Sequence, residues 1–481
     1  MPPGKANSVE ALIAAAVRGE LDKAQALRLC HECPELVALA LLAAAKRIGE
    51  QEARIVELEA PPQANQPSPS TPSGMVPIYT KPNTPKRRQK PGAKQGHPGR
   101  RRKAPARIDA QQTHRLARCP GCGGPLQRCA RKRTRIIEDI PEQIPPVVTE
   151  HTIFRDYCPK CKKHVEPVVP DALPHATIGH HLIGLTAWLH YGLGVTIDQI
   201  IDLLSYHLQT ELTPGGLIDA WRRLAEILVQ WYEQIAAEAK NSAYLHADET
   251  GWRVNGQGCW LWCFTNERNC YYTIEYCRGS PVLQKFFTEA FDGVLITDFW
   301  AAYDSVEAAD RQKCLPHLLR ELEKVDLSNN CAEWQAFAKR LRRLLRDGIR
   351  LRKRPNFTPQ RYRRRIDRLN QRLGAMATEE RGDADARRLT KRLRRYAEYI
   401  FTFLDYPYVP HDNNFGERQI RPAVILRKNS QSNRSDRGAA TQAALMSVYR
   451  TLRLRGLNPT TTIADALRTY LTTGQLPRLP P

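Results

Sequence analysis

SAYLHADETGW, residues 242–252, is the stretch that decides the fold, because a series of strand-like segments begins with it. GCWLWCFT (258–265) and CYYTIEY (270–276) follow as two further strands, rich in aromatic residues. A short helical segment at 281–290 then leads to GVLITD (293–298), whose apolar run is typical of a buried strand. The sequence therefore predicts three successive strands, a helix and a fourth strand.

Two aspartates stand at strand ends in this series. Asp248 comes directly after the short strand-like run at 243–247, and Asp298 ends the apolar run that begins at Gly293. The predicted order of elements is the opening order of a ribonuclease-H-like α/β domain, in which Asp248 and Asp298 lie on adjacent strands. Side chains alternate along a strand, so Glu249 is expected on the opposite face from Asp248. Asp304 is expected on a loop or helix after the fourth strand.

A third acidic residue, Glu417, lies in HDNNFGERQIRP (411–422), where Asp412 and the asparagines after it can cap a helix. Two strand-end aspartates and a helical glutamate can hold two hard divalent cations, which clamp the attacking and leaving oxygens of a phosphodiester. We therefore expect Asp248, Asp298 and Glu417 to be catalytic and to bind Mg²⁺ or Mn²⁺. A single aspartate is more often a cap or a surface residue, so the prediction depends on the combination.

The composition indicates a large basic protein with a nucleic-acid partner. The 481 residues suffice for about three domains, and a net charge of +23, from 73 Lys and Arg against 50 Asp and Glu, favours polyanions. The odd number of 13 cysteines argues against a disulfide framework. No signal peptide is visible, and the longest apolar run, 36–45, is too short to span a bilayer. We expect a soluble cytoplasmic protein with no membrane partner.

The N-terminal region, residues 1–60, is predicted to be helical. Leu41, Ile48 and Ile55 repeat at seven-residue spacing, as in a short coiled coil, and a packed local hairpin fits the same residues.

Residues 61–105 are predicted to be a linker. Its first part is rich in proline, and 86–103 holds nine basic residues in 18 positions with no acid. Such an arm either is a solvated tether or follows DNA phosphates, and the second is preferred because several charges add up to salt-sensitive binding. The candidate contacts are Arg87, Arg88, Lys90, Arg100, Arg101 and Arg102.

A zinc-binding domain is predicted at 106–170. CPGC (119–122) and CPKC (158–161) present four thiolates, which suit a tetrahedral structural zinc. Strand-like segments at 134–140 and 147–154 are expected to bring the two pairs together. The predicted Zn²⁺ ligands are Cys119, Cys122, Cys158 and Cys161; Cys129, His151 or His164 can substitute if the pairing differs, and four free cysteines are the alternative.

Residues 171–240 are predicted to be helical. LTPGGLIDAWRRLA (212–225) resembles a turn that enters the second helix of a helix-turn-helix, with Arg222 and Arg223 on that helix. Helix pairs of this kind are also common as scaffolding.

The catalytic domain is predicted at 241–450, with a helical insertion at about 325–405. Residues 339–368 hold fourteen basic residues in 30, against two aspartates, which predicts contact with the DNA backbone. A C-terminal tail is expected at 451–481. After Glu417, further phosphate contacts are expected from Arg418, Arg421, Arg427 and Lys428.

These motifs together resemble the transposases of insertion-sequence family sixty-six, a branch of the DDE transposases. The residues that carry the resemblance are HADETGW (246–252), DFWAAY (298–303), CLPHLLR (314–320), DNNFGERQIRP (412–422), RKN (427–429), the cysteine pairs and KPGAKQGHPG (90–99). The resemblance covers nearly the whole chain. It implies a catalytic triad of Asp248, Asp298 and Glu417, an N-terminal coiled coil, a DNA-binding zinc region and a helical insertion in the nuclease fold.

The expected activity is cutting at insertion-sequence ends and joining of the freed 3′-hydroxyl to target DNA. A homo-oligomer and accessory proteins from the same element are further expected partners. The alternatives are an inactive DNA-binding protein derived from a transposase, and a metal-dependent nuclease without joining. For His246, His317, Trp252 and Trp300, core packing is expected, and contact with DNA is the alternative.

Overall fold

The computed structural model separates into two units, residues 1–72 and 73–481. The structure describes residues 22–35, 37–38, 105–127, 133–141, 144–354, 357–430 and 432–481. In the first unit it describes helix α2 (Lys23–Glu32). The heptad positions and the basic arm lie outside the described residues, so the predictions for the coiled coil and for Arg87, Arg88, Lys90, Arg100, Arg101 and Arg102 stay predictions.

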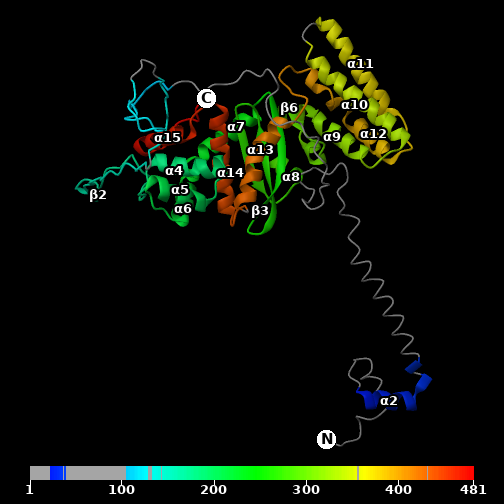
Figure 1. Cartoon of the computed structure of the whole chain (residues 1–481). Helices are drawn as coiled ribbons and strands as arrows, with labels where there is room; N and C mark the ends of the chain where they lie inside the picture. The colour runs from blue at the N-terminus through cyan, green and yellow to red at the C-terminus, as the bar shows by residue number, and fades with distance from the viewer. Residues whose placement is uncertain are drawn as a thin grey trace, which may run out of the picture. The chain divides into compact units, whose positions relative to one another are not determined.

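A five-stranded mixed sheet stands at the centre of the second unit (Figure 1). Its order is β5-β4-β3-β6-β7, with β3 at Tyr244–Val254, β4 at Gln257–Thr265, β5 at Cys270–Glu275, β6 at Phe291–Thr297 and β7 at Ala308–Lys313. β3, β4 and β5 form an antiparallel meander, whereas β6 and β7 run parallel to β3. The predicted order of three strands, a helix and a strand is confirmed, with α8 (Ser280–Phe286) as the helix.

The first strand of the sheet is longer than predicted. β3 continues past Asp248 to Val254, so Asp248 lies within a strand and does not end one. A two-residue turn at Asn255 and Gly256 joins β3 to β4, with φ of 48° and 76°. Positive φ at both central positions is the geometry of the hairpin turn that Asn-Gly favours, and this turn pairs the whole second half of β3 with β4.

Helices cover one face of the sheet. α13 (Asn414–Ser430) packs on β3, and α14 (Asp436–Leu454) packs on β5, as Figure 1 shows. Their apolar residues share one core with Trp252 and Tyr272 of the sheet. On the opposite face, α8 and its neighbours bury an aromatic group that includes Trp262.

Four α-helices of the described part of the second unit precede the sheet and extend the first core: α4 (His180–Ala187), α5 (Ile197–Leu208), α6 (Pro214–Ile227) and α7 (Val229–Lys240). A π-helical turn, η3 (Trp188–Gly192), continues α4. Thr196 begins α5 with a capping box, because its hydroxyl accepts from Gln199 N while the Gln199 side chain accepts from Thr196 N. The predicted helical character of this region is confirmed.

A second helical group lies between β7 and α13 in the chain. It contains α9 (Leu315–Asp326), α10 (Ala332–Arg352), α11 (Pro359–Thr378) and α12 (Ala384–Tyr396). These helices bury a core of their own, which reaches the sheet through apolar residues of β6. The predicted insertion is therefore helical, and its core fixes its position against the β6 side of the sheet.

Residues 451–481 do not form the expected tail. α14 runs on to Leu454, and α15 (Pro459–Thr473) packs against α4. Its apolar residues, among them Ile463 and Leu467 at i, i+4 spacing, join the first core. The last residues are also held, because Trp231 Nε1 donates to the carbonyl of Pro477 at 2.7 Å.

The cysteine-rich region contains one small hairpin. β1 (Asp156–Cys158) pairs antiparallel with β2 (Lys163–Val165), so the hairpin carries the second cysteine pair by itself. The strands expected at 134–140 and 147–154 are absent from the described residues of those segments. Their isoleucines and valines are exposed, so no packing partner supports an extended pair. Among the described residues, no helix is long and apolar enough to cross a membrane.

Candidate active site

The sheet brings Asp248 and Asp298 to one place. The parallel pairing of β3 with β6 ends at His246 and Ile296, and each aspartate lies two residues beyond that last pair. Asp298 comes directly after β6, where its Oδ1 accepts from Trp300 N at 2.8 Å. The prediction that the two aspartates lie on adjacent strands is therefore confirmed in geometry, whereas their catalytic role stays a prediction.

Helix α13 brings Glu417 to the same place. Glu417 lies in the first turn of α13, which packs on β3. Burial raises the pKa of Asp248 well above its usual range, and the neighbouring carboxylates of Glu249, Asp298 and Glu417 raise it further. The three predicted residues thus share one electrostatic environment with an excess of negative charge. A divalent cation neutralises such an excess, and carboxylate oxygens are the ligands that Mg²⁺ prefers.

Asn413 fastens the start of α13 to β3. Its amide Nδ2 donates to the carbonyl of Ala247 at 3.0 Å, and its Oδ1 lies 2.8 Å from Nδ1 of His246. Both side chains are buried. Burial lowers the pKa of His246 to about 4, so its ring is neutral at physiological pH and Nδ1 can donate to Asn413. His246 is thus a core residue, as expected, and it positions the helix that carries Glu417.

A glycine makes this close approach of helix and strand feasible. A Cβ at Gly416 would lie 2.9 Å from Oδ1 of Asn413 and 3.3 Å from Cβ of His246. A side chain at this position would push the first turn of α13 away from β3, and Glu417 with it.

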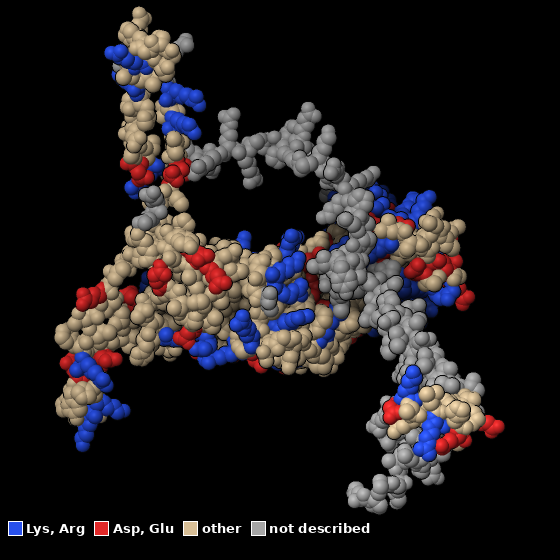
Figure 2. Space-filling model, turned by 60° about the horizontal axis from the view of Figure 1, so that its bottom comes forward, with Lys and Arg blue, Asp and Glu red and all other residues tan. Residues whose placement is uncertain are grey.

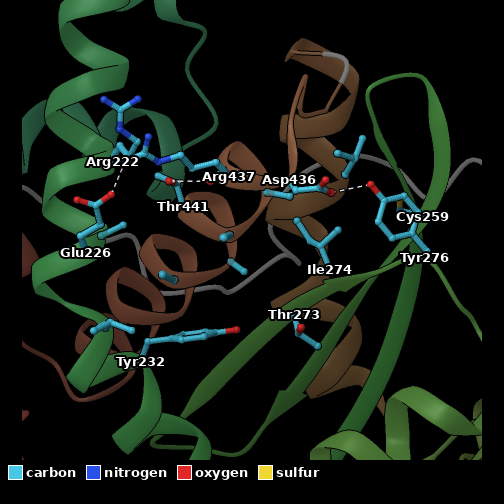
Figure 3. Close-up of a pocket in the computed structure, with 17 residues that line it drawn as sticks. Arg222, Glu226, Tyr232, Cys259, Thr273, Ile274, Tyr276, Asp436, Arg437 and Thr441 are labelled. Carbon is cyan, nitrogen blue, oxygen red and sulfur yellow. Dashed lines mark hydrogen bonds and ion pairs between the residues drawn. The ribbon is translucent and has the colours of Figure 1, made fainter.

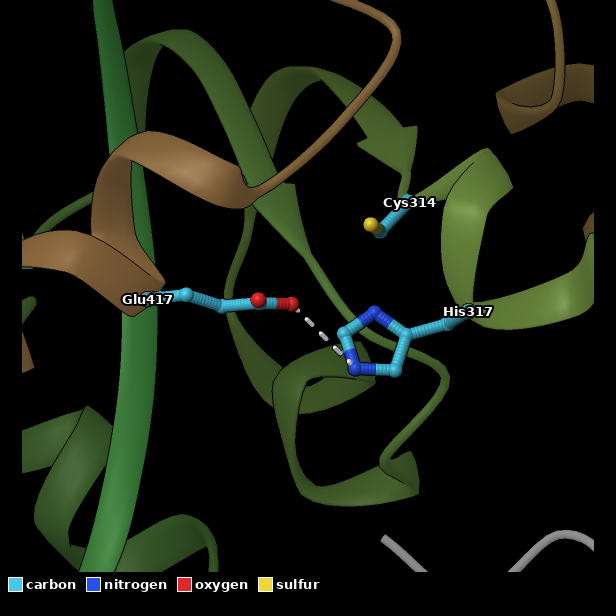
Figure 4. Close-up of side chains that lie close together, drawn as sticks. All are labelled: Cys314, His317 and Glu417. Carbon is cyan, nitrogen blue, oxygen red and sulfur yellow. Dashed lines mark ion pairs between the residues drawn. The ribbon is translucent and has the colours of Figure 1, made fainter. Parts of the chain in front are cut away.

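The carboxylate of Glu417 lies beside two basic side chains of α9, of which Figure 4 shows His317. Oε1 of Glu417 lies 2.9 Å from Nη2 of Arg320 and 3.5 Å from Nε2 of His317. Burial lowers the pKa of His317, and the charge of Arg320 lowers it further. His317 was expected in the core, but its side chain is 30% exposed and faces Glu417, so sequence reasoning underestimated it.

Cys314 completes a compact cluster with these groups. It is the residue before α9, and its Sγ accepts from Asn413 N at 3.2 Å. Ligand atoms of Cys314, His317 and Glu417 all lie within 4.8 Å of one another. Nδ1 of His317 is buried without a hydrogen-bond partner. The i, i+3 spacing of Cys314 and His317 at a helix start could have shown that the two lie side by side, whereas it holds no information on Glu417.

Two other acidic residues near the triad, Glu249 and Asp304, form ion pairs with basic side chains. Glu249 faces the opposite side of the sheet, as predicted, where it pairs with Arg278 at 2.7 Å and accepts from the hydroxyl of Tyr303. Asp304 lies in a 3₁₀ helix (Ala301–Ser305) and pairs with Lys313 at 3.5 Å, as well as with Arg395 and Tyr396 of α12.

The aspartate before α13 has a local role. Oδ1 of Asp412 accepts from Asn414 N at 3.0 Å, which satisfies a free backbone donor at the helix start. The predicted cap is confirmed.

The two cysteine pairs form separate turns. A backbone N–H of Gly121 and the neighbouring Cys122 lower the pKa of Cys119, and Cys161 does the same for Cys158. Gly123 has φ of 71°, which closes the first turn. N–H groups aimed at sulfur favour thiolates and hence metal binding. Among the described residues, however, the four sulfurs do not gather within metal-ligand distance, so a Zn²⁺ site stays a prediction.

The basic residues after Glu417 divide into two kinds. Arg418, Arg421 and Lys428 are exposed. Arg427 is turned inward, because its Nη1 donates to the carbonyl of Gly251 and, at 3.2 Å, to the hydroxyl of Thr250. The prediction of a phosphate contact is therefore not supported for Arg427, whose guanidinium holds α13 to β3.

On α6, both arginines of the predicted helix-turn-helix have partners within the protein. Arg222 pairs with Asp219, and Arg223 donates to the carbonyl of Pro174.

A cavity of about 370 Å³ lies on the α14 side of the sheet, away from the triad (Figure 3). Helices α6 and α14 and strand β5 supply its walls, and hydrogen bonds such as Tyr276 OH to Asp436 Oδ1, at 2.6 Å, close its rim. None of the three triad residues lines it.

Charged side chains form separate groups on the protein surface. Figure 2 shows several groups of Lys and Arg on the face in view, with Asp and Glu between them. On the face in view, the basic side chains of the described residues thus form patches and do not cover the surface evenly.

The comparison with protein families agrees with the motifs and with this geometry. The model of the family described as "Transposase IS66 family" matches residues 175–441, which is 267 of the 481 residues. The chain belongs to the IS66 family of transposases. The matched range contains the sheet, the helical insertion and all three carboxylates. Membership supports a transposase-related function, and a transposase acts on DNA.

One curated relative is an uncharacterized protein, y4qI, from Sinorhizobium fredii. It is 24% identical over 266 residues, and the match covers 49% of each chain. The chain therefore spans about half the length of this relative.

Proposed function

We propose that this member of the IS66 family is a metal-dependent DNA transposase that cuts at insertion-sequence ends and joins the freed 3′-hydroxyl to target DNA. The observation that carries the proposal is the meeting of Asp248, Asp298 and Glu417 from three separate elements in one negatively charged place. The strand order β5-β4-β3-β6-β7, with the helical group between β7 and α13, supports a ribonuclease-H-like catalytic domain with an insertion.

By residue type, the three carboxylates suit two Mg²⁺ or Mn²⁺ ions, which prefer oxygen ligands. Among the described residues their oxygens do not all lie within 4.8 Å of one another, so bound ions would have to draw them together. Asp248 and Asp298 would be ligands from the sheet, and Glu417 would be a ligand from α13. Such ions, when bound, neutralise charge on the scissile phosphate and lower the pKa of coordinated water. Burial and the neighbouring carboxylates raise the pKa of Asp248, and Arg320 pairs with Glu417 at 2.9 Å. Binding of a cation therefore requires Arg320 to release that carboxylate, and its 46% exposed side chain is free to move.

The residues around the triad position it for the reaction. Asn413 and His246 fix the distance between α13 and β3, and Arg427 fastens α13 further along β3. Once released, Arg320 lies beside the reacting phosphate and can bind one of its oxygens through the guanidinium. Exposed Arg418, Arg421 and Lys428 follow on the same helix and would hold the DNA backbone on either side of the cut.

We also propose that Cys119, Cys122, Cys158 and Cys161 hold a structural Zn²⁺. The support is the two Cys-Pro-x-Cys turns, in each of which N–H groups stabilise a thiolate. We further propose that the protein acts as a homo-oligomer, together with accessory proteins from the same element.

The test is a cutting and joining assay with the full chain. Labelled duplexes that carry the ends of its own element are incubated with Mg²⁺ or Mn²⁺, and the strands are separated on a denaturing gel. We expect shorter strands from cutting and longer strands from joining, and Asp248→Asn should abolish both while DNA binding is retained. Asp292→Asn is the matched control, because Asp292 is an exposed aspartate on β6.

Each other outcome points to a different function. Shorter strands without longer ones would indicate a nuclease that does not join. Binding without altered strands, in the presence of the other proteins of the element, would indicate an inactive DNA-binding protein and contradict the proposal.

A further inference from the structure

A pocket of about 270 Å³ lies between α10 and α11 of the helical insertion, in a part of the chain that the triad does not use. Its polar wall consists almost wholly of guanidinium groups. The arginines that line it are Arg350, Arg354, Arg365, Arg368 and Arg372, with one acidic residue, Asp347. The lining therefore carries five positive charges and one negative charge, a net charge of 5 − 1 = +4.

Within the described part of the chain, one of these arginines has an acidic partner. Arg372 pairs with Asp347 at 2.9 Å. The other four are exposed, and no ion pair joins them to an acidic residue in the described part of the chain. Arg365 and Arg368 lie three residues apart on α11, a spacing at which like charges on a helix repel each other. Arg350 lies in the last turn of α10, and Arg354 lies two residues after that helix ends.

Some arginines elsewhere on the same two helices are matched with acids. Both Nη atoms of Arg340 donate to the carboxylate of Glu379, at 2.9 and 2.8 Å, and Arg363 pairs with Asp405 at 2.7 Å. Other exposed arginines lie outside the pocket on both helices, among them Arg343, Arg346, Arg361 and Arg364, so the excess of positive charge is general to α10 and α11. The pocket is the place where unpaired guanidinium groups line a concave surface.

The pocket also offers an apolar surface. Phe357, Leu351 and Leu369 line it beside the arginines, and the guanidinium of Arg365 lies 5.6 Å from the centre of the Phe357 ring. Several unpaired guanidinium groups around a concave, partly apolar floor suit an anion that bears an organic group on each side, such as a phosphodiester. A free inorganic anion would leave the apolar floor without a partner.

We infer that this pocket binds the backbone of duplex DNA, as a second contact separate from the triad. The four unpaired arginines would contact successive phosphates, and Phe357 would lie against the sugars between them. The inference rests on the proposed function only in taking DNA as the polyanion. It gives the helical insertion a task in the reaction, which is to hold a segment of duplex away from the point of cutting.

The test measures how DNA affinity depends on salt. The full chain binds a labelled duplex of arbitrary sequence without divalent metal, and log Kd is plotted against log salt concentration. Each lost phosphate contact lowers the slope by about 0.9. Arg350→Gln with Arg368→Gln should therefore lower it by about 1.8. Arg340→Gln with Arg363→Gln removes the same charge from the same helices, but at sites already paired with acids, and should leave the slope nearly unchanged.

A charge-retaining variant guards against misfolding. Arg350→Lys with Arg368→Lys should keep most of the slope, because lysine still contacts a phosphate as a point charge. The inference would be overturned if the slope fell equally in the Arg350/Arg368 and the Arg340/Arg363 glutamine variants, or if it fell in neither.

The two proposals fail separately. If the chain cuts DNA while the pocket variants keep the wild-type slope, only the pocket inference is wrong. If the pocket variants lose slope but no metal supports cutting, only the proposed activity is wrong. Asp248→Asn should bind with the wild-type slope in both cases.

Discussion

Replacement of Asn413 by alanine should uncouple Glu417 from the sheet. Asn413 makes two buried hydrogen bonds, to His246 at 2.8 Å and to Ala247 at 3.0 Å, and alanine would leave both partners unpaired. An unsatisfied buried polar group costs about 1–3 kcal/mol, so the free energy of unfolding should fall by roughly 2–6 kcal/mol. Because these bonds also set the position of α13, the rate of DNA cutting should fall while DNA affinity is kept.

The neighbouring asparagine supplies the control. Asn414 is only partly buried, and its side chain makes no hydrogen bond with another described residue. Asn414→Ala should therefore change the free energy of unfolding by less than about 0.5 kcal/mol. Denaturant unfolding of both variants, with cutting measured where each is folded, compares the two. Equal, small losses of stability would refute the reasoning, and so would a folded Asn413→Ala protein that cuts at the wild-type rate.

Three further predictions concern the same site. Arg320→Gln should lower the Mg²⁺ concentration for half-maximal cutting by about 1.4- to 5-fold, since an exposed ion pair contributes about 0.2–1 kcal/mol; Arg468→Gln, remote from the triad, controls for net charge in the same titration. Asp248→Asn should stabilise the metal-free protein at neutral pH, because the raised pKa of Asp248 makes its ionisation unfavourable in the folded state. That gain in melting temperature should shrink as pH falls towards the usual aspartate pKa of about 3.9, where the carboxyl is protonated in both states, and a constant gain would contradict it. Gly416→Ala should lower unfolding free energy by about 1–3 kcal/mol in the same measurement, because its Cβ would meet Asn413 at 2.9 Å, whereas Gly215→Ala, with open space around it, should not.

Much of the central sheet follows from the sequence because its strands are buried. β4 and β5 are rich in aromatic residues, and β6 is a continuous apolar run. Both patterns are typical of buried strands. The position of Asp248 within β3 was missed because its polar neighbours Glu249 and Thr250 interrupt the apolar pattern. The Asn-Gly pair at 255–256 was the available signal that β3 continues to a hairpin.

Contacts between distant segments were beyond the sequence. Nothing local shows that Cys314 and His317 meet Glu417, roughly a hundred residues later, because the helical insertion between them has to fold first. The same holds for Arg427, whose guanidinium could bind a phosphate but donates to a backbone carbonyl of β3. Charge alone predicts that arginines are present, whereas only the fold shows which of them are already paired.

The prediction of strands at 134–140 and 147–154 was wrong for a different reason. Their β-branched composition is typical of strands, but a strand also needs a partner and a surface to cover, and those segments stay exposed.

Iron-directed cleavage of the protein backbone tests the central claim most directly. Fe²⁺ can replace Mg²⁺ in a site of carboxylate oxygens, and with ascorbate and peroxide it produces radicals that cut the nearest peptide bonds. A shared site at Asp248, Asp298 and Glu417 predicts cuts near all three positions together, with fragment masses that identify them, and excess Mg²⁺ should suppress the three cuts in parallel. Cuts confined to the neighbourhood of Cys314 and His317, or cuts near the three carboxylates that Mg²⁺ does not suppress, would contradict the account.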